Sequence, residues 1–257
     1  MSYKISSVIK FCFEMIILLL LTILSIMFIS ASIDNMILQE EIKSFVSQAT
    51  FEEEVDGVVY YYIIDETIDE DTITKNKYSN GIYANPTLGS PGDIFVMPQS
   101  RMDYIPLSMQ FITFLFGGHA GIVGNDGMLI ESMGGEESDA FVDTYPNDLF
   151  TEERTVIGLR VNASKEERKR ALDNAYSLVG KLYNFFYIFG TADKYYCTDL
   201  CSRVYGEEFG LNYNLDENGI YVSIQDLIKS KDTKITFLKY YDSETDKTYI
   251  YYLKSGN

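Results

Sequence analysis

The pattern of apolar and polar positions separates an N-terminal segment from the rest of the chain. Residues 15–31 form an uncharged, mostly apolar run of about 17 residues, close to the length that spans a bilayer. Lys4 and Lys10 precede this run, and acidic residues follow it. The asymmetry predicts a transmembrane helix with its N-terminus in the cytoplasm and the following residues outside. A cleaved signal peptide is the alternative, although the run exceeds the usual apolar region of roughly 7–15 residues. We expect export in either case.

Beyond this run the period of the apolar residues changes from segment to segment. Helical spacing continues from Ile33 to Ala49 and predicts a stalk or packing helix. Further on, Ser164 and Glu167 have the spacing of a capping box, which predicts a helix to about Val179. Short β-branched and aromatic runs between turn residues predict strands. The expected strands lie at 58–64, 94–96, 119–124, 128–132, 154–161, 234–241 and 248–254, and the further expected helices at 105–116, 197–209 and 223–229.

This order of elements predicts an α+β protein in three parts. Residues 1–32 form the membrane anchor or signal peptide, residues 33–88 a stalk helix and an acidic region that contains a strand, and residues 89–257 the main domain. The carboxylates of the middle part are typical of a solvated face. The spacing of a calcium-binding loop is absent from them.

Charge narrows the classes of function. The formal net charge is −17 at pH 7, from 38 acidic and 21 basic residues. No basic stripe is available to neutralise phosphates, so a nucleic-acid partner is excluded. The same charge disfavours a broad anionic lipid surface as the partner of the folded part. A cationic or neutral substrate is easier to accommodate.

The sequence contains three cysteines, and we expect them to be free thiols. Cys12 lies in the apolar N-terminal segment, which leaves too few cysteines for a disulfide scaffold. Cys197 and Cys201 share one face of a predicted helix, where backbone geometry disfavours a relaxed disulfide. A single histidine with these two cysteines does not have the spacing of a zinc site.

The one histidine of the chain lies in a predicted β-hairpin that also supplies a carboxylate. His119 opens a strand flanked by small residues, and the loop 125–127 joins it to the next strand. If this loop has three residues and Gly127 is left-handed, Gly121 faces Glu131 across the hairpin. Side chains alternate with period two, so His119, Gly121 and Glu131 then share one face. A two-residue loop would instead send Glu131 to the other face.

A thiol–imidazole pair is the chemistry that these residues permit. Cys197 lies where a helix is expected to begin, and both a helix N-terminus and a nearby imidazolium favour the thiolate, which is the nucleophilic form. A lone cysteine or histidine is more often a packing residue. The combination of the two raises the weight of the catalytic interpretation. Cys201 lies one turn further and is expected in the core.

The ordered motifs resemble a known family. Gly92-Asp93-Ile94, Gly118 to Val123, Leu129-Ile130-Glu131 and Tyr195 to Leu200 are similar to the YiiX/YebB-like group. This group consists of circularly permuted papain-fold hydrolases of the NlpC superfamily, related to lecithin:retinol acyltransferase. The resemblance covers roughly residues 89–227 and includes the stretch Gly180 to Asn184.

The resemblance implies a fold and a set of roles. It implies an antiparallel sheet packed on the helix that bears the cysteine, with Cys197 as nucleophile, His119 as base and Glu131 as the polar third residue. We expect the flanking residues Tyr196 and Gly118 to contact the substrate. The family commonly has Ser-Glu after the cysteine, whereas Thr198-Asp199 stand here, and the apolar insertion 98–117 has no assigned role.

The sequence therefore predicts a membrane-tethered, extracytoplasmic cysteine hydrolase. It would cleave an amide or ester bond through a thioester, in a cell-wall peptide according to the expected location, and would need no metal or organic cofactor. A lipid-directed acyl hydrolase or acyltransferase of the same fold is one alternative. A catalytically inactive, papain-like surface binding module is another. The expected partners are the substrate and, through the N-terminal helix, the membrane.

Overall fold

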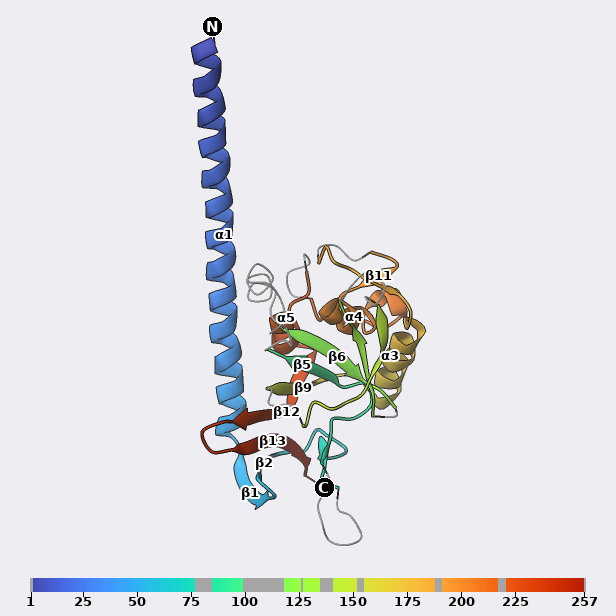
Figure 1. The fold of residues 1–257 in the computed structure, drawn as a ribbon. Coiled ribbons are helices and arrows are strands. Elements are labelled where there is room, and N and C mark those ends of the chain that lie inside the picture. The colour runs from blue at the N-terminus through green and yellow to red at the C-terminus, as the bar shows by residue number, and fades with distance from the viewer. Residues whose placement is uncertain are drawn as a thin grey trace.

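The computed structural model describes residues 2–76, 85–98, 118–125, 127–134, 141–151, 155–187, 191–216 and 221–256. A long helix, α1 (Ser2–Ser47), lies beside a twisted sheet and a group of shorter helices (Figure 1). The apolar segment expected as a helix at 105–116 lies outside the described residues.

Within the described residues, nine strands form one sheet in the order β1-β2-β13-β12-β9-β5-β6-β7-β8. Their bounds are β1 Thr50–Val55, β2 Val58–Asp65, β5 Ile94–Met97, β6 His119–Val123, β7 Leu129–Ser132, β8 Val142–Tyr145, β9 Val156–Val161, β12 Thr233–Asp242 and β13 Lys247–Ser255. Two short pairs lie apart from it, β3 (Ile73–Thr74) with β4 (Thr87–Leu88) and β10 (Leu182–Tyr183) with β11 (Lys194–Tyr195).

The sheet is mixed, which corrects the expected antiparallel sheet. β13 pairs with β2 in parallel, with Thr248 opposite Val58 and Ser255 opposite Asp65. The other neighbouring pairs of this sheet are antiparallel. The parallel pair brings the region before residue 66 into the same sheet as the candidate site. The sequence pattern predicts β2 and β13 individually, but it does not predict that they pair with each other.

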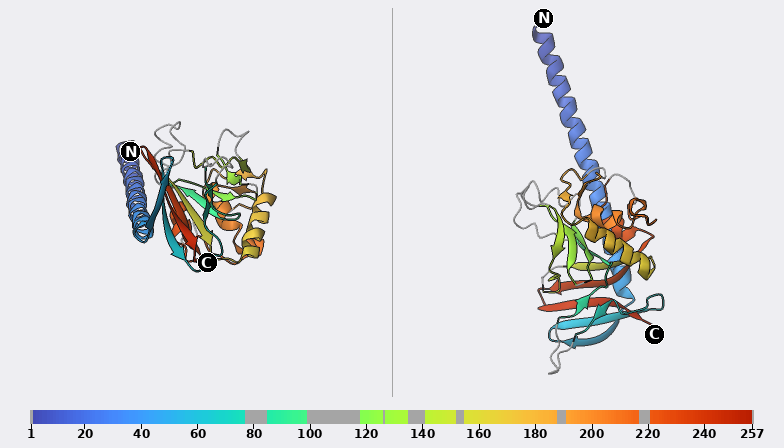
Figure 2. Two further views of the ribbon diagram at one scale, coloured as in Figure 1. Left: turned by 90° about the horizontal axis from the view of Figure 1, so that it is seen from below. Right: turned by 90° about the vertical axis from the view of Figure 1, so that its right-hand side faces the viewer.

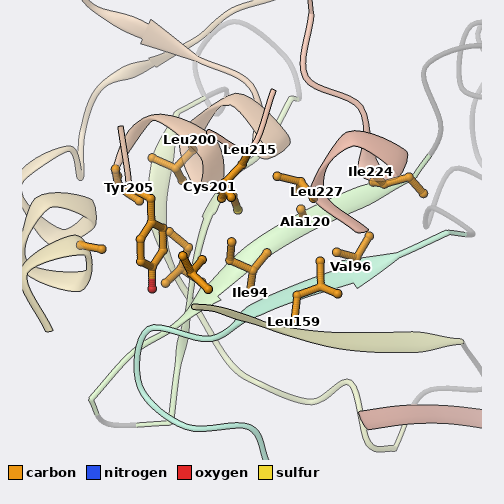
Figure 3. Close-up of a cluster of buried hydrophobic side chains, with 14 of the residues drawn as sticks. Ile94, Val96, Ala120, Leu159, Leu200, Cys201, Tyr205, Leu215, Ile224 and Leu227 are labelled. Carbon is orange, nitrogen blue, oxygen red and sulfur yellow. The ribbon is translucent and has the colours of Figure 1, made fainter. Parts of the chain in front are cut away.

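Short helices cover one face of the sheet, and the main hydrophobic core lies between these helices and the sheet. Leu200 and Cys201 of α4 (Cys197–Arg203) and Leu227 of α5 (Ile224–Lys229) pack over Ile94 and Ala120 of the sheet (Figure 3). All five side chains are fully buried. Burying a leucine side chain contributes roughly 1.5–3 kcal/mol. This packing holds α4 against β6 and β7.

The capping-box prediction is confirmed, whereas the predicted length of the cysteine helix is wrong. The Ser164 hydroxyl accepts from the Glu167 N–H at 3.3 Å, and α3 runs over Lys165–Ser177. α4 ends at Arg203, and a separate 3₁₀ turn, η2, covers Glu207–Phe209. Gly206 precedes this turn in an extended conformation, which ends the helix.

The other face of the sheet has its own apolar cluster. Phe95 and Phe237 meet edge to face, with their ring centres 5.1 Å apart. Gly158 makes this possible, because a Cβ at this position would lie 2.2 Å from the Phe237 ring. Figure 2 shows the strands lying between α1 and α3.

The expected transmembrane helix is not supported. Among the described residues, the structure has no helix with both the length and the apolar character needed to cross a membrane. The apolar run belongs to α1, which continues to Ser47 and packs Leu38 and Phe45 on the core. The uncharged run by itself is shorter than the roughly 20 residues typical of a span. The extracytoplasmic location, which rested on this segment, stays a prediction.

Candidate active site

The β6–β7 hairpin has the register that the sequence predicted. Gly121 faces Glu131, and Val123 faces Leu129. The Gly124 N–H donates to the Met128 carbonyl at 2.8 Å. Gly127 closes the loop in the left-handed conformation, with φ +74°. The three-residue turn therefore puts His119 and Glu131 on one face, as period two requires.

Glu131 reaches His119 across the space above Gly121. The Glu131 carboxylate lies 3.4 Å from His119 Nε2, an ion-pair distance without the alignment of a hydrogen bond. A Cβ at Gly121 would lie 2.7 Å from Glu131 Cγ. Glycine is thus needed for the carboxylate to cross to the ring. Glu131 is 7% exposed, so its charge acts on His119 with little solvent screening.

Cys197 is the first residue of α4, and buried polar contacts fix this end of the helix. The Ser132 hydroxyl donates to the Tyr195 carbonyl at 2.6 Å, which ties β7 to the chain just before the helix. The Thr198 hydroxyl donates to the Val222 carbonyl at 2.5 Å. Cys197 is 8% exposed, whereas Cys201 has no exposure. Both cysteines are buried, and only Cys197 keeps a small exposed fraction at the residue level.

The structure brings Cys197 and His119 into contact, and their charges stabilise each other. Burial favours the neutral thiol, but the His119 imidazolium and the N–H groups of Ala120 and Thr198 lower the pKa of Cys197 overall. Burial likewise favours neutral imidazole, but the Cys197 thiolate and the Glu131 carboxylate outweigh it and raise the pKa of His119 to about 10. The arrangement therefore favours a thiolate–imidazolium pair at neutral pH.

The two residues expected to contact substrate have backbone roles at the site. Tyr196 is the N-cap residue of α4, and its buried hydroxyl accepts from the Val222 N–H at 2.7 Å. Gly118 precedes His119 with φ +86°, and a Cβ there would lie 2.3 Å from the Met97 carbonyl oxygen. Both residues fix the backbone next to a reacting group. Their contact with substrate stays a prediction.

Two tyrosines of the site were not predicted from the sequence. The Tyr183 hydroxyl donates to the Tyr187 hydroxyl at 3.2 Å. Burial, together with the nearby Cys197 charge, raises the pKa of both tyrosines. Tyr187 is also a non-glycine residue with a positive φ of 55°. The resemblance to the YiiX/YebB-like group includes residues 180–184, so it could have indicated that Tyr183 lies near the site.

The departure from Ser-Glu after the cysteine leaves both residues in structural contacts. Thr198 ties α4 to Val222, as described above. Asp199 is 4% exposed and lies 3.5 Å from Arg203 Nη1, one turn along α4. Burial raises the pKa of Asp199 to about 6 although Arg203 lowers it. Arg203 in turn lies over the Tyr195 ring and pairs with Glu208.

No group of three or more His, Cys, Asp or Glu side chains among the described residues is arranged to hold a metal ion. Cys197, His119 and Glu131 form a thiol–imidazole–carboxylate site, in which a cysteine at the start of a helix faces a histidine and a glutamate on a hairpin. Such a constellation is typical of nucleophilic catalysis by a thiolate.

Comparison with known proteins agrees with this class. Residues 108–218 match the family model described as permuted papain-like amidase enzyme, YaeF/YiiX, C92 family. The match confirms the resemblance to the YiiX-like group, and the matched range contains all three residues of the thiol–imidazole–carboxylate site. It indicates a function of the cysteine hydrolase type.

The chain is also similar to the crystal structure of metalloprotein YiiX from Escherichia coli O157:H7. The two sequences are 18% identical, the match covers 57% of this chain and 96% of that chain, and the TM-score is 0.42. The curated proteins contain no match to this chain.

Proposed function

We propose that this protein is a cysteine hydrolase that cleaves an amide or ester bond through a thioester, with Cys197 as nucleophile. The observation that carries the proposal is the contact between Cys197 and His119, with Glu131 3.4 Å from Nε2 of the same ring. An imidazolium beside a thiol at a helix N-terminus is the environment that makes a cysteine reactive. The cell-wall peptide stays a prediction of the sequence.

The proton balance of the reaction follows from this pair. Proton transfer from the thiol to His119 leaves a thiolate and an imidazolium. The Cys197 sulfur then attacks the carbonyl carbon, and the Cys197 backbone N–H is suited to stabilise the resulting oxyanion. As the bond to the leaving nitrogen or oxygen breaks, His119 gives its proton to the leaving group. Neutral His119 next takes a proton from water, whose oxygen attacks the thioester and regenerates the thiol.

Glu131 has a positioning role in this scheme. Its carboxylate stabilises the imidazolium and limits rotation of the ring, since it lies against His119 from the neighbouring strand. It does not contact the reacting carbon. We expect its removal to change the pH dependence of the reaction as well as its rate.

Alkylation by iodoacetamide at pH 7 tests the proposal, with modified peptides quantified by mass spectrometry. Cys12, which is exposed on α1, is the internal reference for an ordinary thiol. We expect Cys197 to react faster than Cys12 in the wild type and more slowly than Cys12 in His119→Ala. Hydrolysis of 4-nitrophenyl acetate should be lost in Cys197→Ser.

The same experiment distinguishes the catalytically inactive binding module. In that case Cys197 reacts slowly in both the wild type and His119→Ala, and ester hydrolysis is the same with and without the Cys197 thiol. Circular dichroism of each variant shows whether the fold is retained. Either slow alkylation or Cys197-independent hydrolysis in a folded protein contradicts the proposed enzyme.

A further inference from the structure

Exposed apolar side chains gather on one segment beside the thiol. Outside α1, the described residues include six exposed large apolar side chains, and four of them fall in residues 179–186. We call these four the 179–186 cluster: Val179, Leu182, Phe185 and Phe186. Phe186 is 79% exposed and Phe185 49%. An apolar group of this kind on a folded protein is typical of a binding surface.

Strand pairing fixes this cluster next to Cys197. β10 pairs in parallel with β11, with Leu182 opposite Lys194 and Tyr183 opposite Tyr195. The Asn184 N–H also donates to the Tyr195 carbonyl at 3.0 Å. Because Tyr195 is two residues before Cys197, these contacts hold the segment against the beginning of α4.

Aromatic contacts continue from Tyr196, the residue before Cys197, to the cluster: the Tyr196 and Tyr187 ring centres are 5.6 Å apart. The Tyr187 ring also meets the Tyr183 ring, with ring centres 6.0 Å apart, and their hydroxyls are 3.2 Å apart. On its other side, the Tyr183 ring meets the Phe185 ring edge to face, with ring centres 4.9 Å apart. The Asn184 side chain accepts from the Phe186 N–H at 3.1 Å and so closes a turn at the exposed phenylalanines. Aromatic side chains therefore run without a break from the residue before Cys197 to the exposed phenylalanines.

We propose that the 179–186 cluster binds the apolar acyl part of the substrate, the group that becomes joined to Cys197 in the thioester. This inference rests on the proposed function. The acyl group is the part of the substrate bonded to the sulfur, and the cluster is held beside the beginning of the helix that bears this sulfur. The leaving group departs with the proton of His119. A neutral apolar acyl group also suits a chain with net charge −17, which repels an anionic one.

The test varies the acyl group and keeps the leaving group constant. kcat/KM is measured for 4-nitrophenyl acetate, butyrate and hexanoate, after subtraction of the rate with Cys197→Ser. In the wild type we expect kcat/KM to rise about twofold per methylene group, half of the roughly fourfold that complete burial of a methylene would give. Phe186→Ser should flatten this series, because it removes aromatic surface that the longer acyl groups would contact.

Phe51→Ser is the matched control variant. Phe51 is an exposed phenylalanine on β1, and its replacement removes an aromatic ring of the same size and comparable exposure. This variant should keep the wild-type chain-length dependence. If it flattens the series as much as Phe186→Ser does, the inference is overturned.

A second arm distinguishes the two sources of an apolar acyl group. The substrates are N-acetyl-leucyl and N-acetyl-glycyl 4-nitroanilides. A leucyl preference that Phe186→Ser removes supports an apolar amino-acid residue as the occupant. A hexanoate preference alone supports a fatty acyl chain.

The outcomes separate this inference from the proposed function. Cys197-dependent hydrolysis with no preference among the esters or among the amides overturns the inference and leaves the proposed function in place. Loss of Cys197 dependence for all substrates overturns both.

Discussion

Glu131 occupies the space that a side chain at Gly121 would fill. The two residues are direct partners across the β6–β7 hairpin, and Glu131 Oε1 would lie only 3.0 Å from a Cβ on Gly121. The glycine thereby lets the carboxylate cross the strand and reach His119. A single missing methyl group thus determines whether the third residue of the site contacts the imidazole.

The first prediction follows from this contact. Gly121→Ala should push the Glu131 side chain away from His119 and lower kcat/KM for ester hydrolysis by about a hundredfold, the size of effect that misplacement by an ångström produces. Gly256→Ala is the control, because the added methyl there is tight only against the exposed Glu66 side chain, at 3.1 Å, and should change the rate little. Equal rates for both variants would contradict the role given to Gly121.

The second prediction concerns pH. The raised pKa of His119 means that its charge is lost only as pH rises through about 10. The lowered pKa of Cys197 means that its thiolate is lost only as pH falls below the range of an ordinary thiol. kcat/KM should therefore be highest between these limits, with an alkaline decline near pH 10.

Glu131→Gln tests the origin of this profile. The amide removes the negative charge that helps to hold the His119 proton, so the alkaline decline should move to lower pH. With less positive charge on His119, the pKa of Cys197 should rise, so the acidic limb should move to higher pH. A profile that keeps its two limbs in Glu131→Gln, with only a lower maximum, would show that the carboxylate acts through geometry alone.

The third prediction concerns a buried ion pair on the strands that support the site. Arg160 Nε lies 2.8 Å from Asp93 Oδ1, and both side chains are almost fully buried. Asp93→Ala leaves the guanidinium buried without this partner and should lower the free energy of unfolding by about 3–5 kcal/mol. Urea denaturation followed by circular dichroism measures the loss.

A surface pair provides the comparison for this variant. Lys247 and Glu54 also form an ion pair, but both side chains are more than one-third exposed. Glu54→Ala should lower the free energy of unfolding far less than Asp93→Ala does, because solvent screens an exposed pair. If the two substitutions have similar effects, burial is not the source of the stabilisation assigned to Arg160–Asp93.

The fourth prediction separates the two cysteines of α4. Burial raises the pKa of Cys201 well above its ordinary value, and this thiol has no exposure. Cys201→Ala should keep more than half of the wild-type activity and the fast alkylation of Cys197, with a loss of about 1 kcal/mol in stability. Alkylation of Cys201 in the native wild-type protein, detected by peptide mapping, would contradict its place in the core.

The contact between His119 and Glu131 could be predicted because it depends on local rules. Turn length and the period of two determine which residues of a hairpin share a face, and residues 119–132 contain all the information required. The start of α4 at Cys197 was similarly local. The meeting of that helix with β6 was not, since it depends on packing between segments far apart in the sequence. The resemblance of the ordered motifs supplied this step.

Features that depend on long-range pairing were missed. Tyr183 lies beside Tyr195, two residues before Cys197, because β10 pairs with β11, and two-residue strands leave no hydrophobic alternation to recognise. The parallel pairing of β2 with β13 also cannot be predicted from the sequence of either strand alone. At the N-terminus, hydropathy predicted a span, which no helix of the described residues supports, whereas the predicted helical continuation from Ile33 is present in α1.

The position of β13 has a consequence for how the protein assembles. In the sheet, β13 is the strand that joins β2 to β12, although the ribosome makes β2 far earlier. The β1–β2 hairpin therefore keeps a row of unpaired backbone groups on β2 until residues 247–255 have been synthesised. During that interval the unpaired edge of β2 can bind chaperones or pair wrongly with a neighbouring nascent chain.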